Sequence, residues 1–219
     1  MSRVGAVVFD LDGTLIDSSA DIASATNFTL EQHGLPRRSL DEIRGFIGDG
    51  ARSLLARAAA LPEQAPGLDP LLATFLAHYS QNPIIETHLF DGVRELLARL
   101  SSLPLCLCTN KPRLPTLAVL EGLGVHDAFR VILCGDDLPE KKPDPALLRH
   151  IAARLELEVS ALVMVGDGPQ DIECARAAGA RSVGVLGNIV APERLRAAGP
   201  DVIVPLREVA DVLERWQRG

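Results

Sequence analysis

The stretch VGAVVFDLDGTL, residues 4–15, joins an apolar run to two carboxylates and a glycine. The apolar run at residues 4–9 predicts a strand that is buried on both faces of a parallel sheet. Asp10 and Asp12 follow at the carboxyl end of that strand, which is the edge where open α/β sheets bind ligands. An ordinary turn, with a capping Asp and Gly13 at positive φ, would explain this stretch equally well. The residues at the other strand ends therefore determine whether this stretch is interpreted as a ligand-binding site or as an ordinary turn.

Five further apolar runs are bounded by turn residues, at residues 103–108, 131–134, 161–165, 182–186 and 202–204. Helical patterns alternate with them at residues 93–100, 114–123, 145–155, 170–178 and 206–216. This alternation predicts an α/β fold with a doubly wound, mainly parallel, Rossmann-like sheet.

One interval breaks the alternation, because residues 16 to about 86 contain no convincing strand. Apolar residues there recur at helical spacing in residues 17–33, 40–46, 51–60 and 68–81. We therefore expect a helical domain at residues 17–85, inserted into a core domain formed by residues 1–16 and 86–219.

Composition excludes several classes of function. A net charge of −7 argues against nucleic acid as a partner, because binding a phosphate backbone requires clustered cations. No run approaches the roughly 20 apolar residues of a membrane span, and residues 1–9 lead straight into charged residues, unlike a secretory leader. We expect a cytoplasmic monomer or homodimer without membrane contact. The four cysteines form no C-x-x-C pair and are interpreted as core thiols.

Polar clusters follow the other strands too. Residues 103–108 end in Thr109-Asn110-Lys111, and residues 161–165 end in a segment that contains Asp167 and Asp171. Between them lies Lys142, in the sequence KKPDP at residues 141–145. Each cluster alone has an ordinary explanation, such as a solvated lysine or an acidic residue in a first helical turn. Together with residues 10–13 they make four polar clusters in a fixed order on one sheet edge.

These four clusters, D-x-D-G-T, T-N, K-P-x-P and G-D-x-x-x-D, together with the helical insert, resemble the haloacid dehalogenase-like superfamily. Within it, the chain is similar to the phosphoglycolate phosphatase-like group over nearly its whole length. The resemblance implies that the motif-bearing strands meet in one crevice and that the insert is a cap over it.

For such a chain the resemblance implies a phosphomonoester hydrolase with an aspartyl-phosphate intermediate. Asp10 is the expected nucleophile, forming a mixed anhydride that water hydrolyses in a second step. Asp12 is the expected general acid and base, which protonates the departing alkoxide and then deprotonates the attacking water. The superfamily's carbon-halogen hydrolases lack this second carboxylate and its transport ATPases carry Thr there, so Asp12 indicates a phosphatase or a phosphomutase.

Paired carboxylates beside a phosphate require a cation, and the resemblance implies Mg²⁺. Its expected ligands are Asp10, the main-chain carbonyl of Asp12, and Asp167, with Asp171 supporting that set or approaching the ion. Lys142 is expected to balance the charge of Asp10 and of the phosphoryl group. The expected phosphate-binding residues are Gly13, Thr109 and Asn110.

The substrate is expected to be a small phosphorylated metabolite, with 2-phosphoglycolate first and a sugar phosphate next. A phosphomutase, or a catalytically silent binding protein on the same fold, remains as an alternative. Two departures from the family pattern bear on this choice. Position 168 is Gly where Ser or Thr is common, and residues 187–189 lack a Gly/Tyr-rich loop.

The turn at residues 48–52 of the cap resembles a loop that faces the active site in this group. Arg52 could bind a substrate carboxylate there, or could be solvated in the first turn of a helix. Lysine usage gives a further hint, since Lys111, Lys141 and Lys142 are the only lysines among 22 basic residues. Three lysines could remain by accident in an arginine-rich chain, but we expect lysine to be required at one of these positions.

Overall fold

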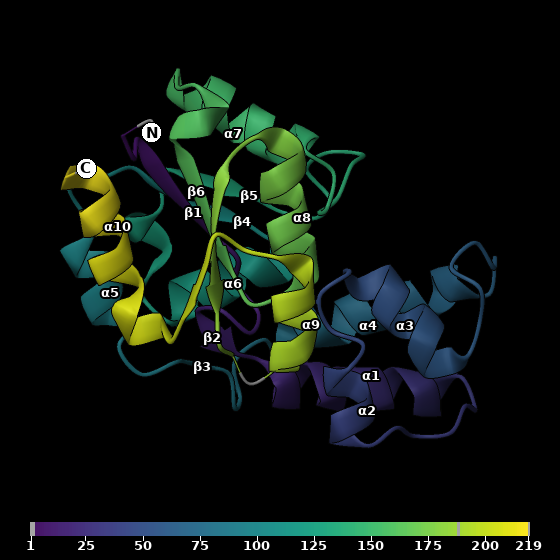
Figure 1. Cartoon of the computed structure of the whole chain (residues 1–219). Coiled ribbons are helices and arrows are strands. Elements are labelled where there is room, and N and C mark those ends of the chain that lie inside the picture. The colour runs from purple at the N-terminus through teal and green to yellow at the C-terminus, as the bar shows by residue number, and fades with distance from the viewer. Residues whose placement is uncertain (1–2, 188, 219) are drawn as a thin grey trace.

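The computed structural model describes residues 3–187 and 189–218, which form an α/β core with a helical insert at one end (Figure 1). Six parallel strands make the main sheet, in the order β5-β4-β1-β6-β7-β8. The strands are β1 (Ala6–Phe9), β4 (Leu105–Cys108), β5 (Val131–Leu133), β6 (Leu162–Gly166), β7 (Arg181–Val185) and β8 (Val202–Val204). The predicted doubly wound α/β fold is confirmed, and all six strands begin or end within three residues of the predicted apolar runs.

Both faces of the sheet are buried, which explains why its strands are apolar throughout. In β1, Val7 and Phe9 point into one apolar cluster, while Ala6 and Val8 point into another. The first cluster is covered by α5 (Val93–Arg99), α6 (Arg113–Gly122) and α10 (Val209–Arg218). The second is covered by α7 (Ala146–Leu155) and α8 (Pro169–Ala178). The four cysteines are all free and buried, as expected of core thiols.

The insert consists of four helices that pack around an apolar cluster of their own, to one side of the sheet (Figure 1). The helices are α1 (Ser19–Gln32), α2 (Leu40–Arg44), α3 (Ala51–Ala59) and α4 (Leu68–Gln81). Phe75 and Tyr79 of α4 and Leu55 of α3 are among the most buried members of this cluster. All four helices fall inside residues 17–85, although the domain limits themselves stay a prediction.

A short antiparallel pair, β2 (Ile16–Asp17) with β3 (His88–Leu89), joins the insert to the core. Two-residue strands carry no periodicity, so the sequence predicted no strand at residues 16–86. Asp21 stabilises the same junction between insert and core. Its carboxylate accepts hydrogen bonds from the main-chain N–H of Ile85 at 2.9 Å and of Thr87 at 2.9 Å. The point where the chain leaves the core and the point where it returns are therefore held together.

Some elements were absent from the prediction. Helix α9 (Pro192–Ala198) packs its Leu195 and Ala198 against Ile172 of α8. The helix predicted at residues 206–216 starts as a 3-10 turn, Leu206–Glu208, before α10 begins. Within the described ranges, none of the helices combines the length and the apolar character needed to cross a bilayer.

Candidate active site

Strand register brings three polar side chains to one place. Strand β1 pairs with β4 on one side and with β6 on the other, so that the three strands end at the same level. Asp10, Thr109 and Asp167 each follow or closely follow one of these ends. Because successive parallel strands point the same way, the carboxyl edge of the sheet collects these three side chains.

Three carboxylates are buried together at this edge. Asp10, Asp167 and Asp171 are 4%, 2% and 0% exposed, and each offers an oxygen within 4.8 Å of the others. Lys142 lies between two of them, with its Nζ 2.6 Å from Oδ1 of Asp10 and 2.6 Å from Oδ1 of Asp171. Burial raises the pKa of Asp10 to about 7, although Lys142 opposes the shift. Burial, and next the charge of Asp10, raises the pKa of Asp167 well above its usual range.

One oxygen of Asp167 has no donor among the described residues. Its Oδ1 accepts a hydrogen bond from the Thr14 hydroxyl at 2.9 Å, and its main-chain N–H donates to the same hydroxyl oxygen at 3.0 Å. Its Oδ2 is buried, and within residues 3–187 and 189–218 no group donates to it. Gly13, at φ +92°, approaches this oxygen so closely that a Cβ there would lie 2.4 Å from it. A buried acceptor left unpaired costs free energy, so this oxygen is suited to binding a cation.

The charges of the site lead to the same conclusion. Four carboxylates, those of Asp10, Asp12, Asp167 and Asp171, face the ammonium groups of Lys111 and Lys142. With all four carboxylates ionised, the group carries an excess of two negative charges, which one divalent cation would balance. Oxygen-only donors of this kind suit Mg²⁺ rather than a softer metal. The residues present therefore fit the expected magnesium ion.

Asn110 holds the loop of Lys142 in place. Its Oδ1 accepts from the main-chain N–H of Lys142 at 2.9 Å, and its Nδ2 donates to the Lys142 carbonyl at 3.1 Å and to the Gly48 carbonyl of the insert at 3.0 Å. Both amide hydrogens are thus engaged, which differs from the expected donation to phosphate. The Thr109 hydroxyl accepts from the main-chain N–H of Lys111 at 3.1 Å, so its own proton stays available to a phosphoryl oxygen.

Asp12 is held by two residues that the sequence prediction did not assign to it. Lys111 places its Nζ 3.0 Å and 3.2 Å from the two carboxylate oxygens, and the Ser18 hydroxyl donates to Oδ1 at 2.5 Å. Lys111 also donates to the Tyr79 hydroxyl of α4 at 2.7 Å. Burial alone would lower the pKa of Lys111, but the charge of Asp12 raises it above its usual value, so the group is an ammonium ion. The scarcity of lysine was the one signal that pointed here.

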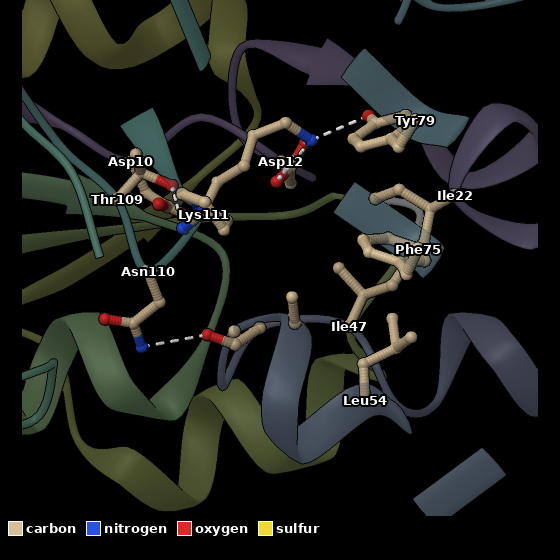
Figure 2. A pocket seen from close by; sticks show the side chains of 14 residues that line it. Asp10, Asp12, Ile22, Ile47, Leu54, Phe75, Tyr79, Thr109, Asn110 and Lys111 are labelled. Carbon is tan, nitrogen blue, oxygen red and sulfur yellow. Dashed lines mark hydrogen bonds and ion pairs between the residues drawn. The ribbon is translucent and has the colours of Figure 1, made fainter. Parts of the chain in front are cut away.

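A pocket opens between this edge and the insert (Figure 2). One side is polar, with Asp10, Asp12, Thr109, Asn110 and Lys111, as Figure 2 shows. The other side is apolar apart from one hydroxyl, and the insert supplies Ile22, Ile47, Leu54, Phe75 and Tyr79. The sequence indicated the polar side through its motifs, but the apolar side consists of ordinary core residues that no motif marks.

Arg52 does not belong to this group. Its Nε donates to the Glu63 carbonyl at 2.7 Å, and its guanidinium pairs with Asp69 at 2.7 Å. Arg52 is the second residue of α3, and Ala51 and Leu54 of the same helix line the pocket instead. One residue along a helix turns a side chain by about 100°, which directs Arg52 away from the crevice. These contacts favour the alternative that Arg52 is a surface residue, and its contact with a substrate carboxylate stays an untested prediction.

Gln170 takes the space beside Gly168. A Cβ on Gly168 would lie 2.2 Å from Nε2 of Gln170, and a Cβ on Gly48 would lie 3.0 Å from the same atom. The Gln170 amide thus lies between the Asp167 loop and the turn of the insert. The segment 187–189, where the sequence lacks the Gly/Tyr-rich loop, includes residue 188, which lies outside the described residues. Gly187 packs closely, since a Cβ there would lie 2.6 Å from the Gly13 carbonyl oxygen.

Comparison with known proteins agrees with this geometry. A family model described as haloacid dehalogenase-like hydrolase matches residues 7–185. N-acetylmuramic acid 6-phosphate phosphatase of Pseudomonas aeruginosa is 35% identical over 217 residues, which cover 97% of this chain and 96% of that protein. Phosphoglycolate phosphatase of Rhodospirillum rubrum is 39% identical over 183 residues, covering 80% and 76%. The crystal structure of a predicted phosphoglycolate phosphatase from Haemophilus somnus superimposes with a TM-score of 0.88 at 28% identity, covering 97% and 99%. The resemblance drawn from the four motifs is confirmed.

Proposed function

The chain belongs to the haloacid dehalogenase-like hydrolase family and is a phosphatase, and from that premise we propose that it hydrolyses a small phosphate monoester with Mg²⁺ through an aspartyl-phosphate on Asp10. The observation that carries the proposal is the buried contact of Asp10 with Lys142 inside a cluster of three carboxylates.

In the first step a carboxylate oxygen of Asp10 attacks phosphorus, and the bond between phosphorus and the ester oxygen breaks. Lys142 orients Asp10 and favours its anionic form, because an ammonium at 2.6 Å stabilises the carboxylate against the opposing effect of burial. The leaving oxygen takes a proton from the carboxyl group of Asp12 and departs as an alcohol. The product of this step is a mixed anhydride on Asp10 and an ionised Asp12.

In the second step a water molecule attacks phosphorus of the anhydride, and Asp12 accepts the proton that the water loses. The bond between phosphorus and the Asp10 oxygen breaks, which regenerates the Asp10 carboxylate and releases inorganic phosphate. Thr109 can donate its hydroxyl proton to a phosphoryl oxygen in both steps, since its oxygen accepts from Lys111 and, among the described residues, none is found to accept that proton. Asn110 contributes by holding the Lys142 loop.

The metal would be held by Asp10, Asp167 and the main-chain carbonyl of Asp12, with Asp171 beside them. When bound, Mg²⁺ supplies positive charge that offsets the carboxylates and polarises the phosphoryl group. The unpaired Oδ2 of Asp167 and the excess of two negative charges are the support for this assignment.

Two substrates are proposed from the names of the relatives. 2-Phosphoglycolate comes first, as the ester that several relatives between 36% and 41% identical are named for. N-acetylmuramic acid 6-phosphate is the second, because a relative so named covers 97% of this chain. Location in the cytoplasm and a monomeric or dimeric state stay predictions.

The test is a phosphate-release assay on both esters and on p-nitrophenyl phosphate, with Mg²⁺ and with EDTA. Acid quenching during turnover, followed by peptide mass spectrometry, should find a phosphoryl group on Asp10. Release of phosphate from a metabolite ester without any bisphosphate activator would also separate a phosphatase from a phosphomutase. No phosphate release from any of the three esters would refute the proposal.

A further inference from the structure

Lys111 is the cation that the pocket offers to a substrate. Among the described residues that line the pocket, it is the one with a positively charged side chain. It is 6% exposed, so it is held in the wall rather than on the surface. The other cations are engaged or exposed: Lys142 lies between two carboxylates, Lys141 is exposed, and Arg52 is paired with Asp69.

The ammonium of Lys111 still has a donor to give. An ammonium carries three N–H groups. Within the described residues it contacts Oδ1 of Asp12 at 3.0 Å, Oδ2 of Asp12 at 3.2 Å and the Tyr79 hydroxyl at 2.7 Å. Two of these contacts go to the same carboxylate, so giving up the longer one offers an N–H to a ligand while Lys111 stays bonded to both Asp12 and Tyr79.

The position of Lys111 determines which part of the substrate can accept this N–H. Asp12 is the group proposed to protonate the ester oxygen, and Lys111 touches Asp12 directly. A substituent on the carbon next to the ester oxygen therefore comes within reach of Lys111. In a phosphate ester of an α-hydroxy acid, that substituent is a carboxylate, only two bonds from the ester oxygen.

The surroundings strengthen such a contact. Ile22, Leu54 and Phe75 are at most 5% exposed and form the opposite wall. Charges interact more strongly beside an apolar wall than in water, because the local dielectric is lower. An acid whose carboxylate lies far from the ester oxygen would instead have to place that carboxylate against, or beyond, these apolar side chains.

We propose that Lys111 binds the substrate's carboxylate and makes this chain selective for phosphate esters of α-hydroxy acids over sugar phosphates. Tyr79 holds the ammonium from the insert side, and Asp12 holds it from the core side. This inference rests on the proposed phosphatase function and chooses between its two candidate substrates. It also transfers to Lys111 the carboxylate contact that the sequence had suggested for Arg52.

The test compares 2-phosphoglycolate with 2-hydroxyethyl phosphate, which has a neutral CH₂OH in place of the carboxylate. Both are alkyl esters and need the same proton from Asp12, so their ratio of kcat/KM isolates the carboxylate contact. In the wild type, we expect 2-phosphoglycolate to be preferred by about 10-fold to 100-fold, as for one charge-assisted hydrogen bond. Lys111→Met should bring this ratio close to one, and Lys111→Arg should retain part of it.

Lys141→Met is the matched control, because it removes an exposed lysine one residue from Lys142 and should leave the ratio unchanged. A fall on both esters by the same factor in Lys111→Met would show that Lys111 only positions Asp12, and would overturn the inference. A wild type that hydrolyses p-nitrophenyl phosphate with Mg²⁺ but does not prefer 2-phosphoglycolate would also overturn it, while the proposed function stands. Hydrolysis of none of these esters would instead refute the proposed function.

A second measurement covers the case in which Lys111→Met does not fold. Glycolate and ethylene glycol differ in the same way as the two esters, and each can compete with p-nitrophenyl phosphate in the wild type. We expect glycolate to inhibit at least about 10-fold more strongly, for the same charge-assisted contact. Equal inhibition by the two alcohols would contradict the role of Lys111.

Discussion

The ammonium of Lys142 lies 2.6 Å from Oδ1 of Asp10, although 132 residues separate them in the chain. The same ammonium reaches Asp171 at 2.6 Å, and all three side chains are nearly inaccessible to solvent. Removing one partner from such a buried group leaves an uncompensated charge, which is strongly unfavourable. Substitutions in this group should therefore affect catalysis far more than substitutions of exposed ion pairs.

Asp10→Asn should abolish turnover while the fold is retained. The amide keeps the shape of the side chain, but it lacks the anionic oxygen that attacks phosphorus and binds a metal. We expect a loss of more than about 100-fold in kcat, or roughly 3 kcal/mol. Circular dichroism would check the fold alongside the phosphate-release assay. A variant that keeps more activity than this would remove Asp10 from the nucleophilic role.

Lys142→Arg should be severely impaired, whereas Lys141→Arg should behave like the wild type. Arginine keeps the positive charge but spreads it over a planar fork, which does not fit between two carboxylates that each lie 2.6 Å from one nitrogen. A fall in kcat/KM of about 100-fold is expected for the first variant, from roughly 3 kcal/mol of lost transition-state binding. Equal kinetics in the two variants would mean that lysine usage here is accidental.

Metal removal should make stability depend on pH in a defined direction. Without a cation, burial raises the pKa of Asp10 to about 7 from the ordinary value of 3.8. Between those values the folded state binds a proton that the unfolded state does not, so stability falls as pH rises through this window. The protein in EDTA should accordingly melt at a lower temperature near pH 7.5 than near pH 5.5.

Added Mg²⁺ should raise the melting temperature more at the higher of these pH values, because it favours the ionised carboxylates. Asp10→Asn is the control, since it removes the titrating group and should flatten the difference. A melting temperature in EDTA that rises with pH for the wild type, relative to Asp10→Asn, would contradict the buried, uncompensated state of Asp10.

The sequence predicted the polar wall of the site better than the apolar one. Asp10, Thr109 and Asp167 could be grouped because parallel strands end at one edge, so a strand pattern alone brings them together. The pairing of Asp12 with Lys111 spans 99 residues, and it depends on side-chain directions within a turn that no periodicity reveals. The role of Tyr79 could not be predicted for a different reason, since an aromatic residue at helical spacing is normally a core residue.

The orientation of Arg52 shows the same limit on a smaller scale. The prediction located it in the first turn of a helix, and it is indeed the second residue of α3. Which face of that helix looks into the crevice depends on how α3 packs on α4, and the packing turns Ala51 and Leu54 inward. A shift of one residue in helical phase therefore separates a substrate ligand from a surface ion pair.

Arg52→Ala should consequently leave KM for 2-phosphoglycolate and for p-nitrophenyl phosphate unchanged. Its partner Asp69 has a side chain that is 70% exposed, and such exposed ion pairs contribute at most about 1 kcal/mol. A small fall in melting temperature is the expected effect. A rise in KM confined to the carboxylate-bearing ester would restore Arg52 as a substrate ligand.

Gly168 and Gln170 should behave as a coupled pair. A side chain at position 168 would collide with the Gln170 amide, whose Nε2 lies 2.2 Å from the position of the added Cβ. The amide is the far end of a flexible side chain, so Gly168→Ser can be accommodated if Gln170 moves. The Gln170 amide also lies beside the turn of the insert, because a Cβ added to Gly48 would come within 3.0 Å of its Nε2. Displacing Gln170 should therefore disturb the turn of the insert that the Asn110 amide also contacts.

We expect Gly168→Ser alone to lower kcat/KM by about fivefold, since contacting residues typically couple by roughly 1 kcal/mol. Gln170→Ala opens the space that the serine needs, so the double variant Gly168→Ser/Gln170→Ala should recover most of that loss. Kinetics of all four proteins on p-nitrophenyl phosphate form a double-mutant cycle that measures the coupling. Strictly additive effects would show that the two positions act independently, and that glycine at position 168 is not explained by the glutamine beside it.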